Sequence, residues 1–158
     1  MDRTTATFKR QISIAAPASR VWRALCDPGE VAQWDAGVRF PIDPPVDYPQ
    51  PGQRVRWRTT GRVFRILLDE PVEVVPERRL RANLSLGPAR YDETYTIRTA
   101  VDESAISAGH CLLLMVVTLS IASVPGRRIA FRHFSADTPT SMVSALTSIK
   151  SHCEALGA

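Results

Sequence analysis

Apolar and polar positions alternate at the start of the chain and then change to a helical repeat. The alternating apolar residues predict a strand over residues 6–15, and they are Phe8, Ile12 and Ile14. Pro17 suits the first position of a helix, because proline lacks only an N–H that this position does not use. We predict that this helix ends at Cys26, and its apolar stripe consists of Val21, Trp22 and Leu25.

A second short helix is predicted directly after the first, over residues 27–35. Asp27 can cap free N–H groups, Pro28 fits the first turn, and Glu30 completes a capping-box spacing. Trp34 lies three positions after a valine and shares its helix face. Each of the two short helices therefore carries one tryptophan.

The next segment is rich in proline. Residues 41–51 hold five of the chain's twelve prolines. This excludes a helix or a central strand, because proline cannot donate a backbone hydrogen bond. We predict a stiff, extended connection, which either spans a gap between elements or forms a rim over a pocket.

Alternation returns after Gly52. It predicts five strands separated by short breaks, over residues 53–60, 62–75, 78–87, 90–100 and 109–122. Short connections favour antiparallel pairing of neighbouring strands. The segment after Pro125 is predicted to be helical, with Pro139 opening or kinking the helix. Its apolar residues recur at intervals of four, three, four and three, and they are Met142, Leu146, Ile149, Cys153 and Leu156.

The net charge of +4 comes from arginine, since the chain has 18 Arg and only 2 Lys. Three arginines alternate with Val55 and Trp57 and so share one strand face; they are Arg54, Arg56 and Arg58. We favour a solvated outer sheet face over a stripe that follows phosphates, because no aromatic side chains interleave on the basic face. No specific nucleic-acid binding is therefore expected.

The three cysteines, at positions 26, 111 and 153, are far apart and odd in number. Their spacing fits neither a metal site nor a disulfide framework, so we expect small buried thiols, no metal and a cytoplasmic protein. The first eleven residues contain no apolar run that would indicate a secretory signal. The longest apolar run, residues 111–117, is too short to span a membrane. The length of 158 residues predicts a single domain, over residues 1–158.

Short motifs accompany this order of elements. The first predicted strand leads into Ala16-Pro17 and Val21-Trp22, and Asp27-Pro28 precedes Trp34-Asp35. With them the chain resembles the helix-grip superfamily (SRPBCC), which includes START-type lipid-transfer domains, Bet v 1-type allergens and the polyketide cyclase/dehydrase group. The resemblance implies an α+β fold in which a curved antiparallel β-sheet wraps around a long C-terminal helix. Two short helices after the first strand would close a cavity between helix and sheet.

Strand parity then assigns side chains to the inner face of that sheet. It places Ile66, Leu68, Val72 and Val74 there from the long strand 62–75, and a bulge in this strand would exchange its faces. It also places Val116 and Thr118 there from the last strand. The candidate ligand-binding residues are Trp34, Trp57, Phe64, Leu84, Tyr91, Glu93, Tyr95, His110, Leu112, Leu114, Met142, Leu146 and Ile149.

Three polar candidates are also candidates for acid–base catalysis: Glu93, Tyr95 and His110. Each has a purely structural alternative. His110 starts a strand and can be half exposed, Glu93 can pair with Arg62, and tyrosine is common in strands. For Trp34, core packing and ligand contact both stay open. No motif for a nucleophile, zinc or phosphate is present, and no cofactor is expected.

Three functional classes remain open. The favoured one is a module, monomeric or homodimeric, that binds a small hydrophobic molecule resembling a lipid or a polyketide. The first alternative is a cofactor-free polyketide cyclase, aromatase or dehydratase, in which positioning and proton transfer suffice. The second is a protein-interaction module of the co-chaperone or ribosome-associated type. Convergence of Glu93, His110 and a tyrosine on one point of the cavity would favour the enzyme.

Overall fold

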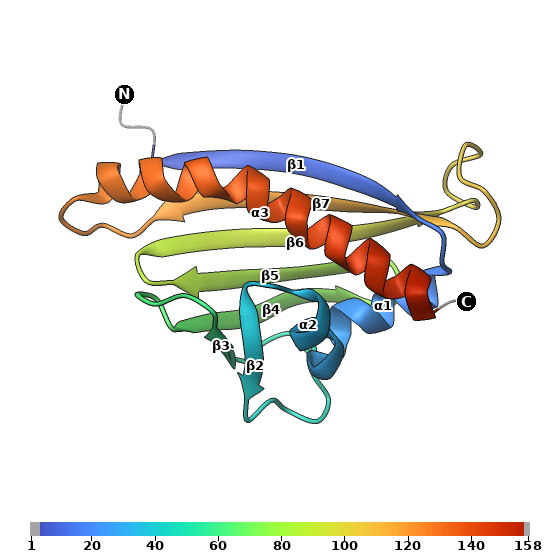
Figure 1. The fold of residues 1–158 in the computed structure, drawn as a ribbon, viewed down its shortest axis with the longest axis horizontal. Coiled ribbons are helices and arrows are strands. Elements are labelled where there is room, and N and C mark those ends of the chain that lie inside the picture. Colours follow the sequence, from blue (N-terminus) through green and yellow to red (C-terminus); the bar gives the residue numbers. More distant parts are fainter. Residues whose placement is uncertain (1–3, 157–158) are drawn as a thin grey trace.

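A computed structural model describes residues 4–156 of the chain (Figure 1). Seven strands and three helices follow one another in it. Their order is β1 (Thr5–Ile14), α1 (Ala18–Cys26), α2 (Pro28–Trp34), β2 (Val38–Ile42), β3 (Val55–Thr59), β4 (Ile66–Val75), β5 (Arg79–Leu86), β6 (Ala89–Thr99), β7 (Cys111–Ile121) and α3 (Arg127–Leu156).

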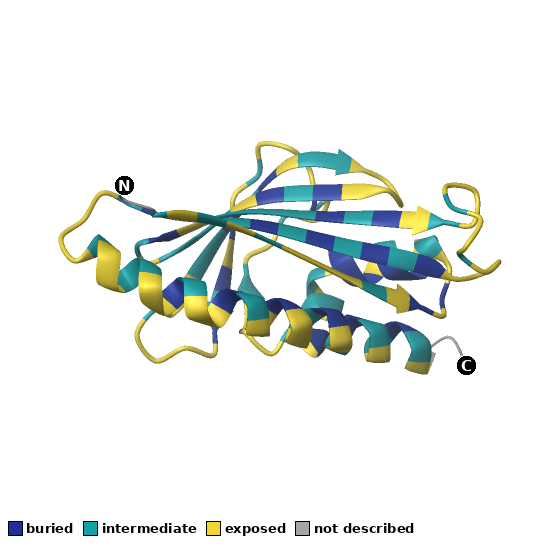
Figure 2. Cartoon of the chain, turned by 90° about the horizontal axis from the view of Figure 1, so that it is seen from above, coloured by how far each residue is buried: buried dark blue, intermediate teal, exposed yellow. Residues whose placement is uncertain are grey.

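The strands form one antiparallel sheet in the order β1-β7-β6-β5-β4-β3-β2. The curved sheet faces α3, which runs diagonally across it, and α1 and α2 lie beside the C-terminal half of α3 (Figure 1). Buried residues gather on the side of α3 that faces the sheet, and exposed residues lie on its other side (Figure 2). The predicted helix-grip architecture is therefore confirmed. Within the described residues, no helix combines the length and the apolar character needed to cross a membrane.

Local chemistry explains the two short helices. Asp27 caps α2, because its Oδ1 accepts hydrogen bonds from the N–H groups of Gly29 at 2.8 Å and Glu30 at 3.3 Å. The indole N–H of Trp34 donates to the carbonyl of Ala24 at 2.8 Å and ties α2 to α1. Trp34 is buried by this packing, so α1 and α2 form one rigid corner.

The strand β2 was missed by the sequence pattern. It includes Pro41, which pairs with Trp57 of β3. Proline is tolerated there because β2 is an edge strand and needs no hydrogen bond on its outer side. The exclusion of a helix and of a central strand for residues 41–51 holds, whereas the expectation of a loop from residue 41 onward was wrong for its first two residues.

The last helix is longer than its apolar stripe. It runs for 30 residues with Pro139 inside, so Pro139 does not open it. Four stripe residues are buried against the sheet, namely Met142, Leu146, Ile149 and Cys153. The structure does not describe the side chain of the fifth, Leu156. All three cysteines are free and buried, and burial raises the pKa of Cys26 to about 12, so they pack as small apolar side chains.

Strand parity was right for β3, β5 and β6 and wrong for β7. The inner face of β7 carries Leu113, Met115 and Val117, so Leu112, Leu114, Val116 and Thr118 face the opposite side. The cause is the composition of β7, which is apolar at nearly every position and therefore has no alternation to follow.

In β4 the inner face carries Leu67 and Asp69, so the placement of Ile66, Leu68 and Val72 there was also wrong. The register shifts between Pro71 and Glu73, and Val74 packs inward as predicted.

Candidate functional site

Two adjoining hollows lie between the sheet and the helices. The outer hollow has a volume of about 520 Å³ and the inner hollow of about 90 Å³. Six residues border both hollows, so the two adjoin each other: they are Asp35, Val38, Leu67, Leu84, Glu93 and Tyr95.

The outer hollow has a mainly apolar wall. Strands β5 to β7 contribute Leu86, Met115 and Val117, and α3 contributes Phe134 and Met142. Ionisable side chains border it as well, and they are Arg62, His133 and Asp137 beside the shared Asp35 and Glu93. A wall of this kind suits the apolar body of a small molecule.

Phe64 borders the outer hollow. It lies in the connection between β3 and β4, and its ring centroid is 5.8 Å from that of Phe134 in α3. On its other side Phe64 lies against Gly87, in the turn between β5 and β6. A Cβ atom at Gly87 would clash with the Phe64 ring, and the φ of +55° there also favours glycine.

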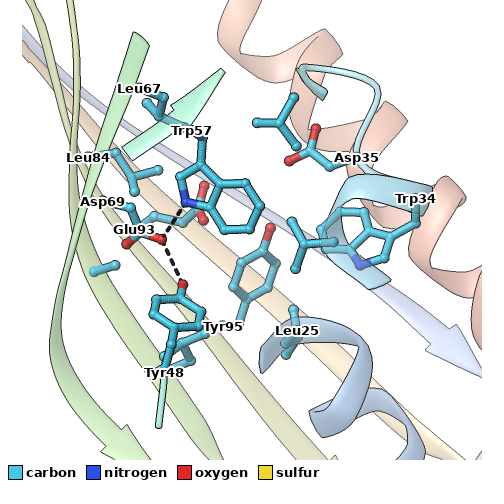
Figure 3. Close-up of a pocket in the computed structure, with 14 residues that line it drawn as sticks. Leu25, Trp34, Asp35, Tyr48, Trp57, Leu67, Asp69, Leu84, Glu93 and Tyr95 are labelled. Carbon is cyan, nitrogen blue, oxygen red and sulfur yellow. Dashed lines mark hydrogen bonds between the residues drawn. The ribbon is translucent and has the colours of Figure 1, made fainter. Parts of the chain in front are cut away.

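Four aromatic residues and three carboxyl groups line the inner hollow (Figure 3). The aromatic residues are Trp34, Tyr48, Trp57 and Tyr95, and the carboxyl groups belong to Asp35, Asp69 and Glu93. None of the residues around this hollow is lysine, arginine or histidine. Within residues 4–156, no three His, Cys, Asp or Glu side chains gather closely enough to hold a metal ion. The three carboxyl groups are thus spread around the wall.

Asp69 holds two of the aromatic side chains in place. Its Oδ2 accepts hydrogen bonds from the hydroxyl of Tyr48 at 2.6 Å and from the indole N–H of Trp57 at 3.1 Å. Its Oδ1 is buried and has no hydrogen-bond partner in the described part of the chain. Burial raises the pKa of Asp69 although both hydrogen bonds act to lower it.

Glu93 lies in β6, between Ala82 of β5 and Val117 of β7. Protein surrounds the carboxyl group, and the surface that it still exposes faces the hollows. Burial raises the pKa of Glu93 to about 8, and the neighbouring Asp35 and Asp69 add to the shift. Glu93 makes no hydrogen bond or ion pair with any described side chain, so at pH 7 most of the protein carries a protonated Glu93.

Tyr95 is the second polar group without a partner. Only 7% of its surface is exposed, and its hydroxyl forms no hydrogen bond with the described residues. The hydroxyl points into the space between Asp35 and Trp57 (Figure 3). Burial, followed by the charges of Glu93 and Asp35, raises the pKa of Tyr95 well above its ordinary value, so the phenol stays neutral.

Eight of the predicted ligand-binding residues line one or both hollows: Trp34, Trp57, Phe64, Leu84, Tyr91, Glu93, Tyr95 and Met142. Two others, Leu146 and Ile149, are buried in the core and border neither hollow. Three were placed wrongly. His110 is exposed in the turn before β7, and Leu112 and Leu114 face the outer side of β7. Glu93 and Tyr95 therefore converge as the enzyme hypothesis required, whereas His110 does not join them.

Three polar residues of the inner hollow, Asp35, Tyr48 and Asp69, were missed in the sequence. Asp69 is an acid in a run of apolar residues, and the correct register of β4 would have found it. Tyr48 belongs to the proline-rich segment, which therefore forms part of the pocket wall. Asp35 ends α2 and accepts a hydrogen bond from the N–H of Gly37 at 2.8 Å. Neither Tyr48 nor Asp35 belongs to a strand or helix repeat that would assign its side chain to the inner face. The suggested pairing of Glu93 with Arg62 does not occur.

Known proteins provide an independent comparison. The family model described as polyketide cyclase/dehydrase and lipid transport matches residues 5–148. No curated protein matches the sequence significantly.

Several solved structures share the fold. The Zhui aromatase/cyclase from Streptomyces sp. R1128 aligns with a TM-score of 0.77 at 14% identity, over 95% of this chain and 94% of that one. TTHA0849 from Thermus thermophilus aligns with a TM-score of 0.71 at 18% identity, over 97% and 100%. A START superfamily protein from Mycobacterium smegmatis aligns with a TM-score of 0.63 at 13% identity, over 89% and 93%. At these identities the similarity shows the fold alone.

Proposed function

The chain belongs to the polyketide cyclase/dehydrase and lipid transport family, and on that premise we propose that it binds one small, largely apolar molecule. The apolar body of this molecule occupies the outer hollow and its polar end enters the inner one. The observation that carries the proposal is an apolar hollow of about 520 Å³ that adjoins a small one bordered by three carboxyl groups. Burying about 200 Å² of apolar ligand surface contributes roughly 5 kcal/mol, which corresponds to a dissociation constant of about 0.2 mM before entropic costs.

Filling the outer hollow tests this function. Ala145 of α3 borders the hollow, whereas Ala136 of the same helix is exposed. We expect Ala145→Phe to weaken binding of the neutral fluorophore N-phenyl-1-naphthylamine at least tenfold. Ala136→Phe is the matched control and should leave the affinity within a factor of two. Equal binding by both variants would show that the fluorophore does not enter the hollow.

A second candidate function is proton-transfer catalysis of the cyclase or dehydratase type. It is favoured by the protonated Glu93 beside the neutral Tyr95 hydroxyl. A neutral carboxylic acid in an apolar wall can donate a proton to a substrate carbonyl, as cyclisation of a polyketide-like chain requires. We expect Glu93→Gln to abolish turnover of a polyketide mimic while fluorophore binding persists. Asp92→Asn, which changes an outward-facing carboxyl of the same strand, is the control. Unchanged turnover in Glu93→Gln would remove Glu93 from the chemistry.

A further inference from the structure

The wall of the inner hollow carries acidic groups without any basic ones. Asp35, Asp69 and Glu93 border it, and no lysine, arginine or histidine does. An anionic head group placed there would be repelled by any carboxyl that is ionised. A cationic head group would be attracted, and the low polarity of the surroundings would strengthen that attraction.

Tyr95 provides independent evidence that a polar group belongs in this hollow. Its side chain is more than nine-tenths buried, its hydroxyl has no hydrogen-bond partner among residues 4–156, and it points into the hollow (Figure 3). The Glu93 carboxyl is likewise unpaired. Both groups are therefore available to a polar ligand atom, and each can accept a hydrogen bond from it.

The aromatic wall favours positive charge as well. The rings of Tyr48 and Trp57 meet edge to face, with centroids 6.4 Å apart, and Asp69 fixes both through hydrogen bonds. Trp34 and Tyr95 complete the wall. Aromatic faces attract a cation most strongly where water is excluded.

We infer that the ligand is an amphiphilic amine, whose protonated nitrogen enters the inner hollow between Glu93, Asp35 and Tyr95. This inference rests on the proposed binding function. The small volume of the inner hollow admits a compact ammonium group, and the larger outer hollow takes an apolar chain or ring. The ammonium N–H groups donate to the carboxylates of Glu93 and Asp35 and to the oxygen of Tyr95.

Binding then ionises a residue that is neutral in the free protein. A positive charge beside Glu93 favours its carboxylate form, so Glu93 releases a proton when the amine binds at pH 7. A neutral alcohol of the same chain length provides no charge and causes no such release. The number of protons exchanged therefore distinguishes an amine site from a merely apolar pocket.

Three probes with the same chain test the inference: decylamine, 1-decanol and decanoate. We expect decylamine to displace N-phenyl-1-naphthylamine with at least tenfold higher affinity than 1-decanol, and decanoate to bind most weakly. Titration calorimetry in buffers of different ionisation enthalpy should show proton release for decylamine only. Glu93→Gln and Asp35→Asn should each weaken decylamine binding at least fivefold more than they weaken 1-decanol binding, whereas Asp92→Asn should change neither.

The outcomes separate the two proposals. If none of the probes displaces the fluorophore, the proposed binding function itself fails. If all three compete, but decylamine has no advantage over 1-decanol and releases no proton, the hollow binds apolar molecules and the amine inference is wrong. Tighter binding of decanoate would overturn the inference directly.

Discussion

Glu30 of α2 and His152 of α3 are joined at 2.8 Å, between Oε1 and Nε2. The same carboxylate lies 2.7 Å from the guanidinium of Arg20 and 3.0 Å from that of Arg23, both in α1. One acidic side chain thus connects all three helices. Burial acts to raise the pKa of Glu30, but the hydrogen bond with His152 and the ion pair with Arg20 outweigh it and hold the pKa below its ordinary value. The stability that Glu30 contributes is therefore present at neutral pH and lost as the pH falls through that lowered pKa.

Removing the charge of Glu30 should destabilise the protein. We expect Glu30→Gln to lower the free energy of unfolding by about 3 kcal/mol, because Arg20 is buried and would lose its counter-charge. Urea denaturation at pH 7 measures the change. Glu103→Gln is the control, since its ion pair with Arg98 is exposed and contributes less than about 1 kcal/mol. Equal effects of both substitutions would contradict a special role for the Glu30 junction.

Glu93 should make stability depend on pH in the opposite direction. Its pKa of about 8 in the folded protein lies above the ordinary glutamate value, with Asp35, Asp69, Tyr48 and Tyr95 around it. The folded state then binds more protons than the unfolded state, so stability falls as the pH rises towards 8. Glu93→Gln should therefore raise the free energy of unfolding by ~3 kcal/mol at pH 8.5 and by much less at pH 5.5.

Urea denaturation of the wild type and of Glu93→Gln at a series of pH values measures the difference in their free energies of unfolding. If the difference in the free energy of unfolding between Glu93→Gln and the wild type does not grow with pH, ionisation of Glu93 does not destabilise the folded state. Asp92→Asn serves as the control on the same strand, because Asp92 is paired with Arg81 at 2.7 Å on the outer face. The pKa of Asp92 is lowered by Arg81, so its substitution should not produce a gain that grows with pH.

Asp69 should prove more important as an acceptor than as a charge. Asp69→Ala leaves the hydroxyl of Tyr48 and the indole N–H of Trp57 without their shared acceptor, and we expect a loss of about 2 kcal/mol. Asp69→Asn keeps an acceptor oxygen and should cost less than half as much. Thermal unfolding followed by tryptophan fluorescence compares the two. An equal loss in both variants would show that the negative charge matters more than the acceptor.

Docking of α3 depends on its buried stripe. Leu146 is 2% exposed and lies in the main core, whereas Ser144 of the same helix is exposed. Leu146→Asp should prevent folding at 25 °C, because it buries an unpaired charge. Ser144→Asp should melt within a few degrees of the wild type. A cooperative melt of Leu146→Asp near the wild-type temperature would show that the helix is not held by this stripe.

The elements that the sequence predicts well are those whose signals are local. The Asp27 cap and the stripe of α3 act over one or two turns of helix, and both are found in the structure. The short edge strand β2 escaped prediction because its pairing with β3 overrides the unfavourable propensity of Pro41. Pattern alone could not indicate that a proline-bearing stretch would find a partner.

The residues of the site also divide into those with a local signal in the sequence and those without one. Glu93 and Tyr95 were found because β6 alternates clearly, with outward polar residues between inward ones. The position of His110 was wrong because β7 is apolar on both faces, and one residue of shift exchanges them. Asp35 and Tyr48 reach the hollow from segments that connect regular elements. Their positions depend on how α2 and the proline-rich segment pack against the sheet, which is tertiary information.

The contact between Phe64 and Gly87 makes one turn position decide the shape of one side of the outer hollow. Phe64 borders only the outer hollow, whereas Tyr48, Trp57 and Asp69 border only the inner one. Any side chain at residue 87 would push the Phe64 ring from its place. A change at this turn would therefore reshape the part of the site that takes the body of a ligand, while the hydrogen bonds around Asp69 are left as they are. Selection by size and recognition of a polar group thus depend on different parts of the chain, and each can vary without the other.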